Sequence, residues 1–339
     1  MPPLRSNSRE RSPAEGVDSG PKVVARQVDA QPLDARSNPQ PDLPATTFSV
    51  VTVTFARDHI VTHTAAHIRQ LIGDRRDIEF ILVDNNPDEI ARTPMLEGFA
   101  RATYVKVGSN KGVAARNDGA RAAKGDVIVF VDDDAYLNPS DAFERLLRVF
   151  AENPRLGVVT ARHIDAETGD TPRASFPHTN KSLPKDRPFK TFRFQGNGFA
   201  IRREVFEAVG PMSEDFFYGL EEIDYAYRVI KAGFEIAYRP DVWVIEYNDP
   251  GGRAPRQAVE EMRLTNKMII SWKYMPAIYL PLNIAMFSAY VVALNRGRIN
   301  PFRSFWKFVA WVRANPGRRT PIGAQEQDYI RSCGGHVWK

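Results

Sequence analysis

Between residues 48 and 161, short runs of β-branched and aromatic residues alternate with longer amphipathic segments. Runs of the first kind predict strands buried in a sheet, and the segments between them predict helices. The predicted strands are residues 48–55, 78–83, 103–107, 127–131 and 157–161, and the predicted helices are residues 58–73, 112–123 and 140–151. Strands and helices that alternate at this spacing favour an α/β fold with a doubly wound, mostly parallel sheet.

The pattern is less regular on both sides of this region. Residues 1–46 are rich in proline, serine, aspartate and arginine without a sustained apolar period, which predicts a disordered tail. Residues 163–190 hold four prolines and predict a long irregular loop. A strand at 194–201, a helix at 221–232 and two short strands within 234–245 complete the predicted domain.

Three consecutive aspartates, Asp132 to Asp134, follow the predicted strand 127–131 with no basic residue between them. Carboxylates this close repel one another, and folding alone gives no reason to place them at the end of a buried strand. A divalent cation removes the conflict, because Mg²⁺ and Mn²⁺ take oxygen ligands. The alternative is a solvated cluster that caps the following helix. The carboxyl edge of an α/β sheet is where ligands bind, which favours the metal site.

Further polar residues follow the other predicted strands. Asp84 and Asn85 end the second strand, and residues 110–112 precede an alanine-rich helix that carries Arg116. In a parallel sheet these positions lie along one edge. A carboxylate such as Asp84 can accept the imide N–H of a pyrimidine, and a helix N-terminus offers N–H groups to phosphate. Each signal is weak alone, but their order predicts a nucleotide site.

Charge is concentrated near the C-terminus. The chain carries 46 Lys and Arg against 41 Asp and Glu, and residues 253–339 alone carry 14 against 4. A strongly basic region can contact nucleic acid, an anionic membrane surface or a phosphorylated substrate. The single cysteine, Cys333, excludes an internal disulfide and fits a reducing compartment. Residues 1–10 contain no apolar core segment, so no signal peptide is predicted and a cytoplasmic location is favoured.

Several segments, taken in order, resemble the inverting family 2 glycosyltransferases of GT-A fold, such as rhamnosyltransferases and other cell-envelope glycosyltransferases. The resembling segments are VTVTF (51–55), LVDN (82–85), NKG (110–112) with ARN (115–117), FVDDD (130–134), GNGFAIRR (196–203), FFYGLEEIDYAYR (216–228) and YRP (238–240). Together they cover residues 48–250. This ordered set is specific for the family but not for any one sugar.

The resemblance implies a role for each residue at a matching position. A divalent metal, Mg²⁺ or Mn²⁺, would be held by Asp132, Asp134 and Glu246. A nucleoside-diphosphate sugar donor would be bound by Thr54, Arg57, Asp84, Asn85, Lys111, Gly112, Arg116, Asp132 and Asp133. The acceptor would contact Gly196, Asn197 and Gly198. Glu222 would take the proton from the acceptor hydroxyl, with Glu221 beside it and Asp224 as a substitute.

Two positions depart from the family pattern. Glu222 stands where the family more often has aspartate, so the reach of the base differs by one methylene. The histidine that usually completes the metal site is absent, and the matching strand end reads VIEYN (244–248). Glu246 is a candidate oxygen ligand at that strand end, and water is the alternative.

The C-terminal region allows three arrangements. Residues 274–295 contain no charged residue and are long enough to cross a bilayer, but two prolines and two asparagines make a poor spanning helix. Residues 302–313 interleave aromatic and basic side chains, as an interfacial helix on an anionic membrane does. The alternatives to peripheral contact are packing against the preceding domain or a second subunit, and a true span. Nucleic-acid binding is disfavoured because no recognition module accompanies the basic residues.

The sequence and the resemblance together predict an α/β protein of GT-A fold, a mostly parallel sheet flanked by helices with a helical C-terminal extension. The expected parts are a disordered tail (1–46), a catalytic domain (47–252) and a basic, aromatic helical region (253–339). Within the catalytic domain, the nucleotide-sugar half would cover about residues 47–135 and the acceptor half about residues 136–252.

The expected activity is inverting, metal-dependent transfer of a hexosyl or deoxyhexosyl group. The acceptor hydroxyl would belong to a lipid-linked or cell-envelope saccharide, and the enzyme would lie on the inner face of the plasma membrane. A sugar nucleotidyltransferase is one alternative, although residues 55–58 lack the Gly-rich loop it needs after its first strand. A catalytically silent nucleotide-binding protein or membrane scaffold of the same fold is the other.

Overall fold

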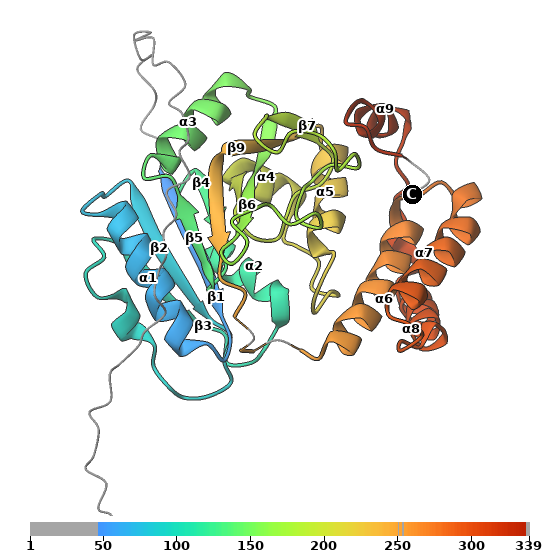
Figure 1. Cartoon of the computed structure of the whole chain (residues 1–339), viewed down its shortest axis with the longest axis horizontal. Helices are drawn as coiled ribbons and strands as arrows, with labels where there is room; N and C mark the ends of the chain where they lie inside the picture. The colour runs from blue at the N-terminus through green and yellow to red at the C-terminus, as the bar shows by residue number, and fades with distance from the viewer. Residues whose placement is uncertain (1–46, 250, 253, 337–339) are drawn as a thin grey trace, which may run out of the picture. The chain divides into compact units, whose positions relative to one another are not determined.

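The structure, a computed structural model, describes residues 47–249, 251–252 and 254–336, and the predicted tail at 1–46 lies outside them. The strands of the described part form a nine-stranded sheet with the order β3-β2-β1-β4-β8-β6-β9-β5, and β7 pairs with β9 (Figure 1). The strands are β1 (Phe48–Thr54), β2 (Ile78–Asp84), β3 (Ala102–Lys106), β4 (Val127–Phe130), β5 (Ala135–Asn138), β6 (Leu156–Asp165), β7 (Phe189–Thr191), β8 (Phe199–Arg202) and β9 (Glu235–Glu246).

The sheet has a parallel half and a mixed half. β1 is parallel to β2 and β4, and β2 is parallel to β3. β8 runs antiparallel to both β4 and β6, and β5 and β7 run antiparallel to β9, whereas β6 and β9 are parallel. The prediction of parallel pairing therefore holds for residues 48–130. The strand direction reverses at β8. The chain reaches β8 through a long loop, whereas two parallel neighbours are usually joined by a crossover helix.

Helices cover both faces of the sheet (Figure 1). α1 and α3 pack on one face through Val61 and Phe143, whereas α2, α4 and α5 pack on the other through Ala120, Val205 and Tyr225. The α-helices are α1 (Asp58–Ile72), α2 (Arg116–Ala122), α3 (Ala142–Glu152), α4 (Arg203–Val209), α5 (Glu221–Lys231), α6 (Arg256–Tyr274), α7 (Leu280–Leu294), α8 (Pro301–Ala314) and α9 (Ala324–Ser332). Short 3₁₀ helices are η1 (Thr93–Leu96), η2 (Gly112–Ala115), η3 (Ala277–Tyr279) and η4 (Pro316–Arg318).

Two predicted elements differ from the structure in kind. The helix expected from residue 112 starts as the 3₁₀ turn η2 and becomes α-helical only at Arg116. The two short strands expected within 234–245 are the single strand β9. Its register with β6 shifts between Ala161 and Arg162, so Pro240 falls in an irregularity of the pairing instead of ending the strand.

The helices after residue 253 confirm the predicted helical extension. Leu264 and Met268 of α6 pack with Val291 of α7 and Phe308 of α8 in a third apolar cluster, and Tyr227 of α5 packs against the same cluster. α6 therefore joins the extension to the sheet-containing domain through α5. Among the described residues, 277–294 are long and apolar enough to cross a membrane by length and composition.

Candidate active site

Three strand ends meet at one edge of the sheet. Thr54 and Asp84 are register partners at the ends of β1 and β2, and Asp132 to Asp134 follow β4 on the other side of β1. The parallel pairing of these strands brings the predicted donor-binding and metal-binding residues together.

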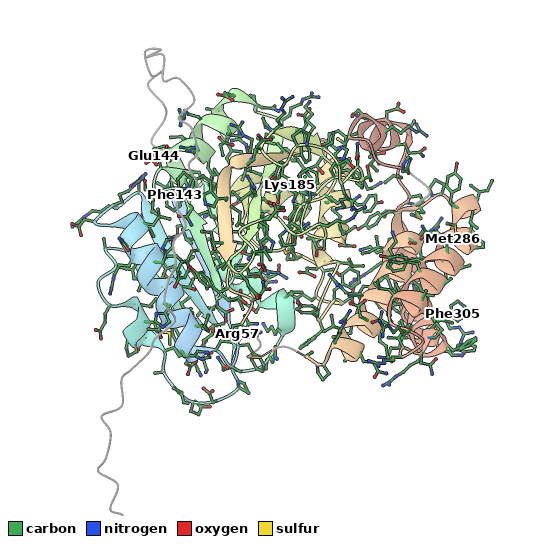
Figure 2. All side chains as sticks on the ribbon, viewed as in Figure 1. Arg57, Phe143, Glu144, Lys185, Met286 and Phe305 are labelled. Atoms are coloured by element: carbon green, nitrogen blue, oxygen red, sulfur yellow. The ribbon has the colours of Figure 1, made fainter. Side chains whose placement is uncertain are left out.

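One arginine forms hydrogen bonds with two of the three aspartates. Arg57, labelled in Figure 2, lies in the turn after β1 and donates from Nη1 to Asp133 Oδ1 at 2.8 Å and to Asp134 Oδ2 at 2.9 Å. Its Nε also donates to the carbonyl oxygen of Gly251 at 2.5 Å, so the chain after β9 closes over it. Asp133 and Asp134 are buried, whereas the side chain of Asp132 is 34% exposed. Asp132 is therefore the accessible carboxylate of the run.

The environment of Asp134 is suited to a cation. Burial raises the pKa of Asp134 to about 7, and the charges of Asp132 and Glu246 add to the effect while Arg57 opposes it. Glu246 ends β9 beside Ala135 of β5, and its carboxylate contacts Nε2 of His163 in β6. The carboxylates thus have the oxygen chemistry that Mg²⁺ and Mn²⁺ prefer, in a setting that penalises their uncompensated charge. Among the described residues, no three His, Cys, Asp or Glu side chains are arranged as a metal site. The ligand set Asp132, Asp134 and Glu246 stays a prediction.

Arg116 connects the aspartates to the acidic helix. Its Nη2 donates to Asp132 Oδ1 at 2.8 Å and its Nη1 donates to Glu221 Oε1 at 3.0 Å. Burial acts to lower the pKa of Arg116, but the charges of Asp132 and Glu221 outweigh it and raise the pKa above the usual value. A permanently charged guanidinium therefore stands between the two predicted halves of the site.

The acidic helix α5 begins at the site with Glu221 and Glu222. Leu220 precedes them with a φ of 69°, a left-handed conformation that costs a branched residue about 1–2 kcal/mol. Glu221 is buried, and its Oε2 has no hydrogen-bond partner among the described residues. Burial raises the pKa of Glu222 to about 8, and the adjacent charge of Glu221 contributes. A carboxylate with a raised pKa is suited to accept a proton near neutral pH.

Asp224, also in the first turn of α5, has partners on another helix. Its carboxylate is fully buried and accepts hydrogen bonds from Lys273 Nζ and Tyr274 Oη of α6, and from Arg228 Nε at 3.2 Å. These bonds make Asp224 an anchor between α5 and α6, and the choice of Glu222 as the base stays a prediction.

Asp84 is saturated with protein partners. Its Oδ1 accepts from the backbone and the side chain of Asn86, and its Oδ2 accepts from Tyr104 Oη at 2.5 Å and from Lys106 Nζ and Arg92 Nη1 at 3.0 Å each. Burial acts to raise the pKa of Asp84, but the hydrogen bonds from Tyr104, Asn86 and Lys106 hold it well below the usual range. Asp84 thus ties β2 to β3, and because five donors already occupy its oxygens, its contact with a donor base stays a prediction.

The loop at residues 110–113 joins the two halves of the site. Asn85 Oδ1 accepts from the backbone N–H of Lys111 at 2.9 Å, and the N–H of Val113 donates to the carbonyl oxygen of Phe217 at 3.0 Å. Gly112 has a φ of 60°, and a Cβ there would lie 2.0 Å from Phe217 O. Only glycine fits at this close backbone approach.

Replacing Gly112 with alanine is expected to cost more stability than replacing Gly73, which has a φ of 58° and no atom within 4 Å of an added Cβ. Gly73→Ala costs only the left-handed backbone strain of about 1–2 kcal/mol. Gly112→Ala adds a clash between the new Cβ and the carbonyl oxygen of Phe217, which forces the two loops apart. Urea unfolding and donor-affinity measurements on both variants check this. Equal losses in the two variants would contradict the proposed contact.

The predicted acceptor residues lie behind the acids. Asn197 is buried, and its Oδ1 accepts from the backbone N–H of Asp132 at 3.1 Å. A side chain at Gly196 would begin 3.5 Å from Glu221 Oε1 and 3.6 Å from Arg116 Nη1. The bend at 196–198, just before β8, therefore lies against Asp132 and Glu221, and its contact with an acceptor stays a prediction.

Sequence reasoning missed several residues that the structure brings to the site. Arg92 is buried against Asp84 and Asp58, His163 pairs with Glu246, and the carbonyl of Phe217 holds Val113. Arg92 lies in a loop and His163 lies near the end of β6, and neither belongs to a motif of the sequence. The glycine of the NKG segment was the one available signal for the approach to Phe217.

Comparison with known proteins finds similar glycosyltransferases. Residues 49–210 match the family model described as Glycosyl transferase family 2. The O-antigen chain rhamnosyltransferase RfbN of Salmonella typhimurium is 33% identical over 129 residues, which are 35% of this chain and 40% of that protein. The pre-mycofactocin glycosyltransferase of Mycobacterium tuberculosis is 24% identical over 233 residues, 62% of this chain and 49% of its own length. The matched region spans about half, or less, of these relatives.

Solved structures share the fold. GalNAc-T7, crystallised with UDP, GalNAc and Mn²⁺, has a TM-score of 0.54 at 17% identity, covering 82% of this chain and 60% of its own. The mannosyltransferase PcManGT of Pyrobaculum calidifontis, in complex with GDP-Man and Mn²⁺, has a TM-score of 0.50 at 17% identity, covering 85% and 79%. Residues 49–210 are therefore similar to the family 2 glycosyltransferases, and the chain shares the GT-A fold of these solved structures.

Proposed function

We propose that this protein transfers a sugar from a nucleoside-diphosphate sugar to a saccharide hydroxyl, with inversion at the anomeric carbon. The observation that carries the proposal is the chain of contacts Asp132–Arg116–Glu221, which sets Glu222 beside the strand ends of the nucleotide half. Inverting transfer needs one base for the acceptor proton and a charged environment for the departing diphosphate. Glu222 serves as that base, and Arg116 faces the developing negative charge.

The donor and acceptor classes follow from the chemistry and from the relatives. A pyrimidine or purine base would lie near the ends of β1 and β2, and a divalent cation would be held by Asp132, Asp134 and Glu246. Bound there, the cation would offset charge on the diphosphate. The related O-antigen chain rhamnosyltransferase supports a cell-envelope saccharide as acceptor and a deoxyhexose or hexose as the transferred sugar.

A panel of nucleotide sugars tests the proposal. The full-length protein is incubated with Mn²⁺ or Mg²⁺, saccharide acceptors and each donor, and nucleoside-diphosphate release and product anomeric configuration are measured. We expect one donor to be turned over with inversion, and chelation of the metal to abolish turnover reversibly. Retention of configuration would contradict the role of Glu222. A protein that binds nucleotide sugars without turnover would be the silent scaffold. Conversion of a nucleotide sugar and added inorganic diphosphate into a nucleoside triphosphate and a sugar 1-phosphate would indicate a nucleotidyltransferase.

The pH dependence of transfer should report the base. Burial and the charge of Glu221 raise the pKa of Glu222 to about 8, and the base works only when deprotonated. kcat/KM is therefore expected to rise with pH through about 8, whereas an exposed glutamate would complete this rise near its usual pKa of about 4.3. Glu221→Gln removes the neighbouring charge, so the rise of kcat/KM with pH should occur at lower pH than in the wild type. A rise at the wild-type pH in this variant would show that the charge of Glu221 does not raise the pKa of Glu222.

A further inference from the structure

α7 exposes an apolar stripe along its whole length. Leu282, Met286, Tyr290 and Leu294 recur every four residues and are each at least half exposed, and Ile278 of η3 extends the stripe with 81% of its surface exposed. Positions spaced by four lie on one face of a helix. Only 11% of residues 277–294 are buried. An apolar helix covered on so little of its surface is not a core helix of this domain.

α8 continues this apolar surface. Phe302 is 74% exposed and Trp306 62% exposed, with Phe305 between them on the same helix. Figure 2 places Met286 and Phe305 on the side of the C-terminal helices that faces away from the sheet. We call the large exposed apolar residues of η3, α7 and α8 the apolar face; they are Ile278, Tyr279, Leu282, Met286, Tyr290, Leu294, Phe302, Phe305 and Trp306.

Positive charge lies on and between the same helices as the apolar face. Residues 262–325 contain ten Lys and Arg and no Asp or Glu. Four of these cations, Arg296, Arg298, Lys307 and Arg313, are exposed, and no carboxylate of the described residues pairs with them. Exposed cations beside exposed aromatic side chains complement a surface that is apolar inside and anionic at its rim.

The contacts of α7 argue against a span and against self-association. Asn283 is buried and accepts a hydrogen bond from Ser271 of α6 at 2.7 Å, and Val291 is buried in the cluster with α6. If α7 spanned the membrane, it would separate from α6. Asn283 would then enter the hydrocarbon without its hydrogen bond from Ser271, and an unpaired polar group there is costly. A second copy would bring two cationic rims together, and like charges disfavour that pairing.

We propose that the apolar face docks in the plane of an anionic lipid bilayer, with the helices lying on the membrane and the cations at the headgroups. α6 carries Lys273 and Tyr274 to Asp224 of α5, so docking holds the helix of Glu222 at a fixed place relative to the bilayer. If the protein transfers sugars as proposed above, this arrangement selects an acceptor that is presented at the membrane surface. It also sets the protein at the cytoplasmic face, where anionic lipids are concentrated.

Vesicle co-sedimentation of the full-length protein tests the docking. We expect binding to phosphatidylcholine vesicles that contain phosphatidylglycerol, little binding to pure phosphatidylcholine, and loss of binding at high salt. Leu282→Ser combined with Met286→Ser should weaken binding roughly tenfold or more, because each buried apolar side chain contributes to partitioning. Ile90→Ser removes a comparably exposed apolar side chain, 59% exposed, from the nucleotide half and should leave binding unchanged.

The outcomes separate docking from its rivals. Phe302→Ser with Trp306→Ser provides an independent pair on α8, and circular dichroism and donor affinity check that every variant is folded. Wild-type protein that stays in solution with anionic vesicles would overturn the proposal. A dimer in light scattering that the serine variants dissociate would identify a second copy instead, and resistance to alkaline carbonate extraction from cells would identify a span. Vesicle binding requires no turnover, so its failure is distinguishable from failure of sugar transfer.

Discussion

Glu222→Gln is expected to lower the turnover number about 10²–10⁴-fold, the range that positioned general bases contribute. Glutamine keeps the size and polarity of the side chain, so the start of α5 and the Arg116–Glu221 ion pair should persist. Donor affinity is expected to change little, because Asp132 and Arg116 remain in place. Steady-state kinetics with saturating donor and acceptor, together with calorimetric donor binding, separate the two effects.

Two further substitutions make this result specific. Glu222→Asp keeps the carboxylate but shortens its reach, and we expect it to retain part of the activity. Asp224→Asn should not reproduce the Glu222→Gln effect on turnover of folded enzyme, because Asp224 is bonded to α6. Transfer by Glu222→Gln at the wild-type rate would show that another group takes the proton.

Asp224→Asn is expected to destabilise the protein by about 3–5 kcal/mol, the cost of breaking a buried ion pair on one side. Asp224 is fully buried, and Lys273 is only 7% exposed, so the ammonium would lose its main counter-charge without gaining water. The hydrogen bond from Tyr274 would also weaken, because a neutral amide oxygen replaces a carboxylate. Urea unfolding, followed by far-ultraviolet circular dichroism, measures the loss.

Asp328→Asn is the matched control for this result. Asp328 pairs with Arg331 at 2.8 Å on the surface of α9, where both side chains are more than half exposed, and its loss should cost less than about 1 kcal/mol. Combining Asp224→Asn with Lys273→Met should recover part of the stability, because an apolar side chain replaces the unpaired charge. If Asp224→Asn behaves like the surface control, the ion pair does not hold α6 to α5.

The local patterns of the sequence were sufficient for most of the fold. Runs such as residues 127–131 are buried on both faces, so their apolar content marks the strands, and parallel neighbours then place Asp84 and Asp132 at one edge. The direction of β8 was not predictable in this way. Its four residues pair with β4 and β6, which are distant in the chain, and no local signal distinguishes a strand entered through a loop from one entered through a helix.

The partners of the site residues were less predictable than the residues themselves. Motif spacing marked Asp132, Arg116 and Glu221, but it did not indicate that one guanidinium bonds both carboxylates. The two ion pairs span 16 and 105 positions in the sequence. Contacts over such separations depend on packing of whole elements. The partners of Asp224 on α6 are also distant in the sequence, so the motif alone predicted a substitute base at this position.

The bond between Asp224 and Lys273 has a consequence for how this protein can diversify. A change of acceptor specificity would be easiest if the C-terminal helices were an exchangeable module, inherited or swapped independently of the sheet. In this protein, Lys273 and Tyr274 of α6 form hydrogen bonds with Asp224 of α5, the helix that carries the proposed base. A graft of α6–α9 from a relative would need to bring both side chains, or α5 would have to adapt first. The two segments are therefore expected to evolve as a pair.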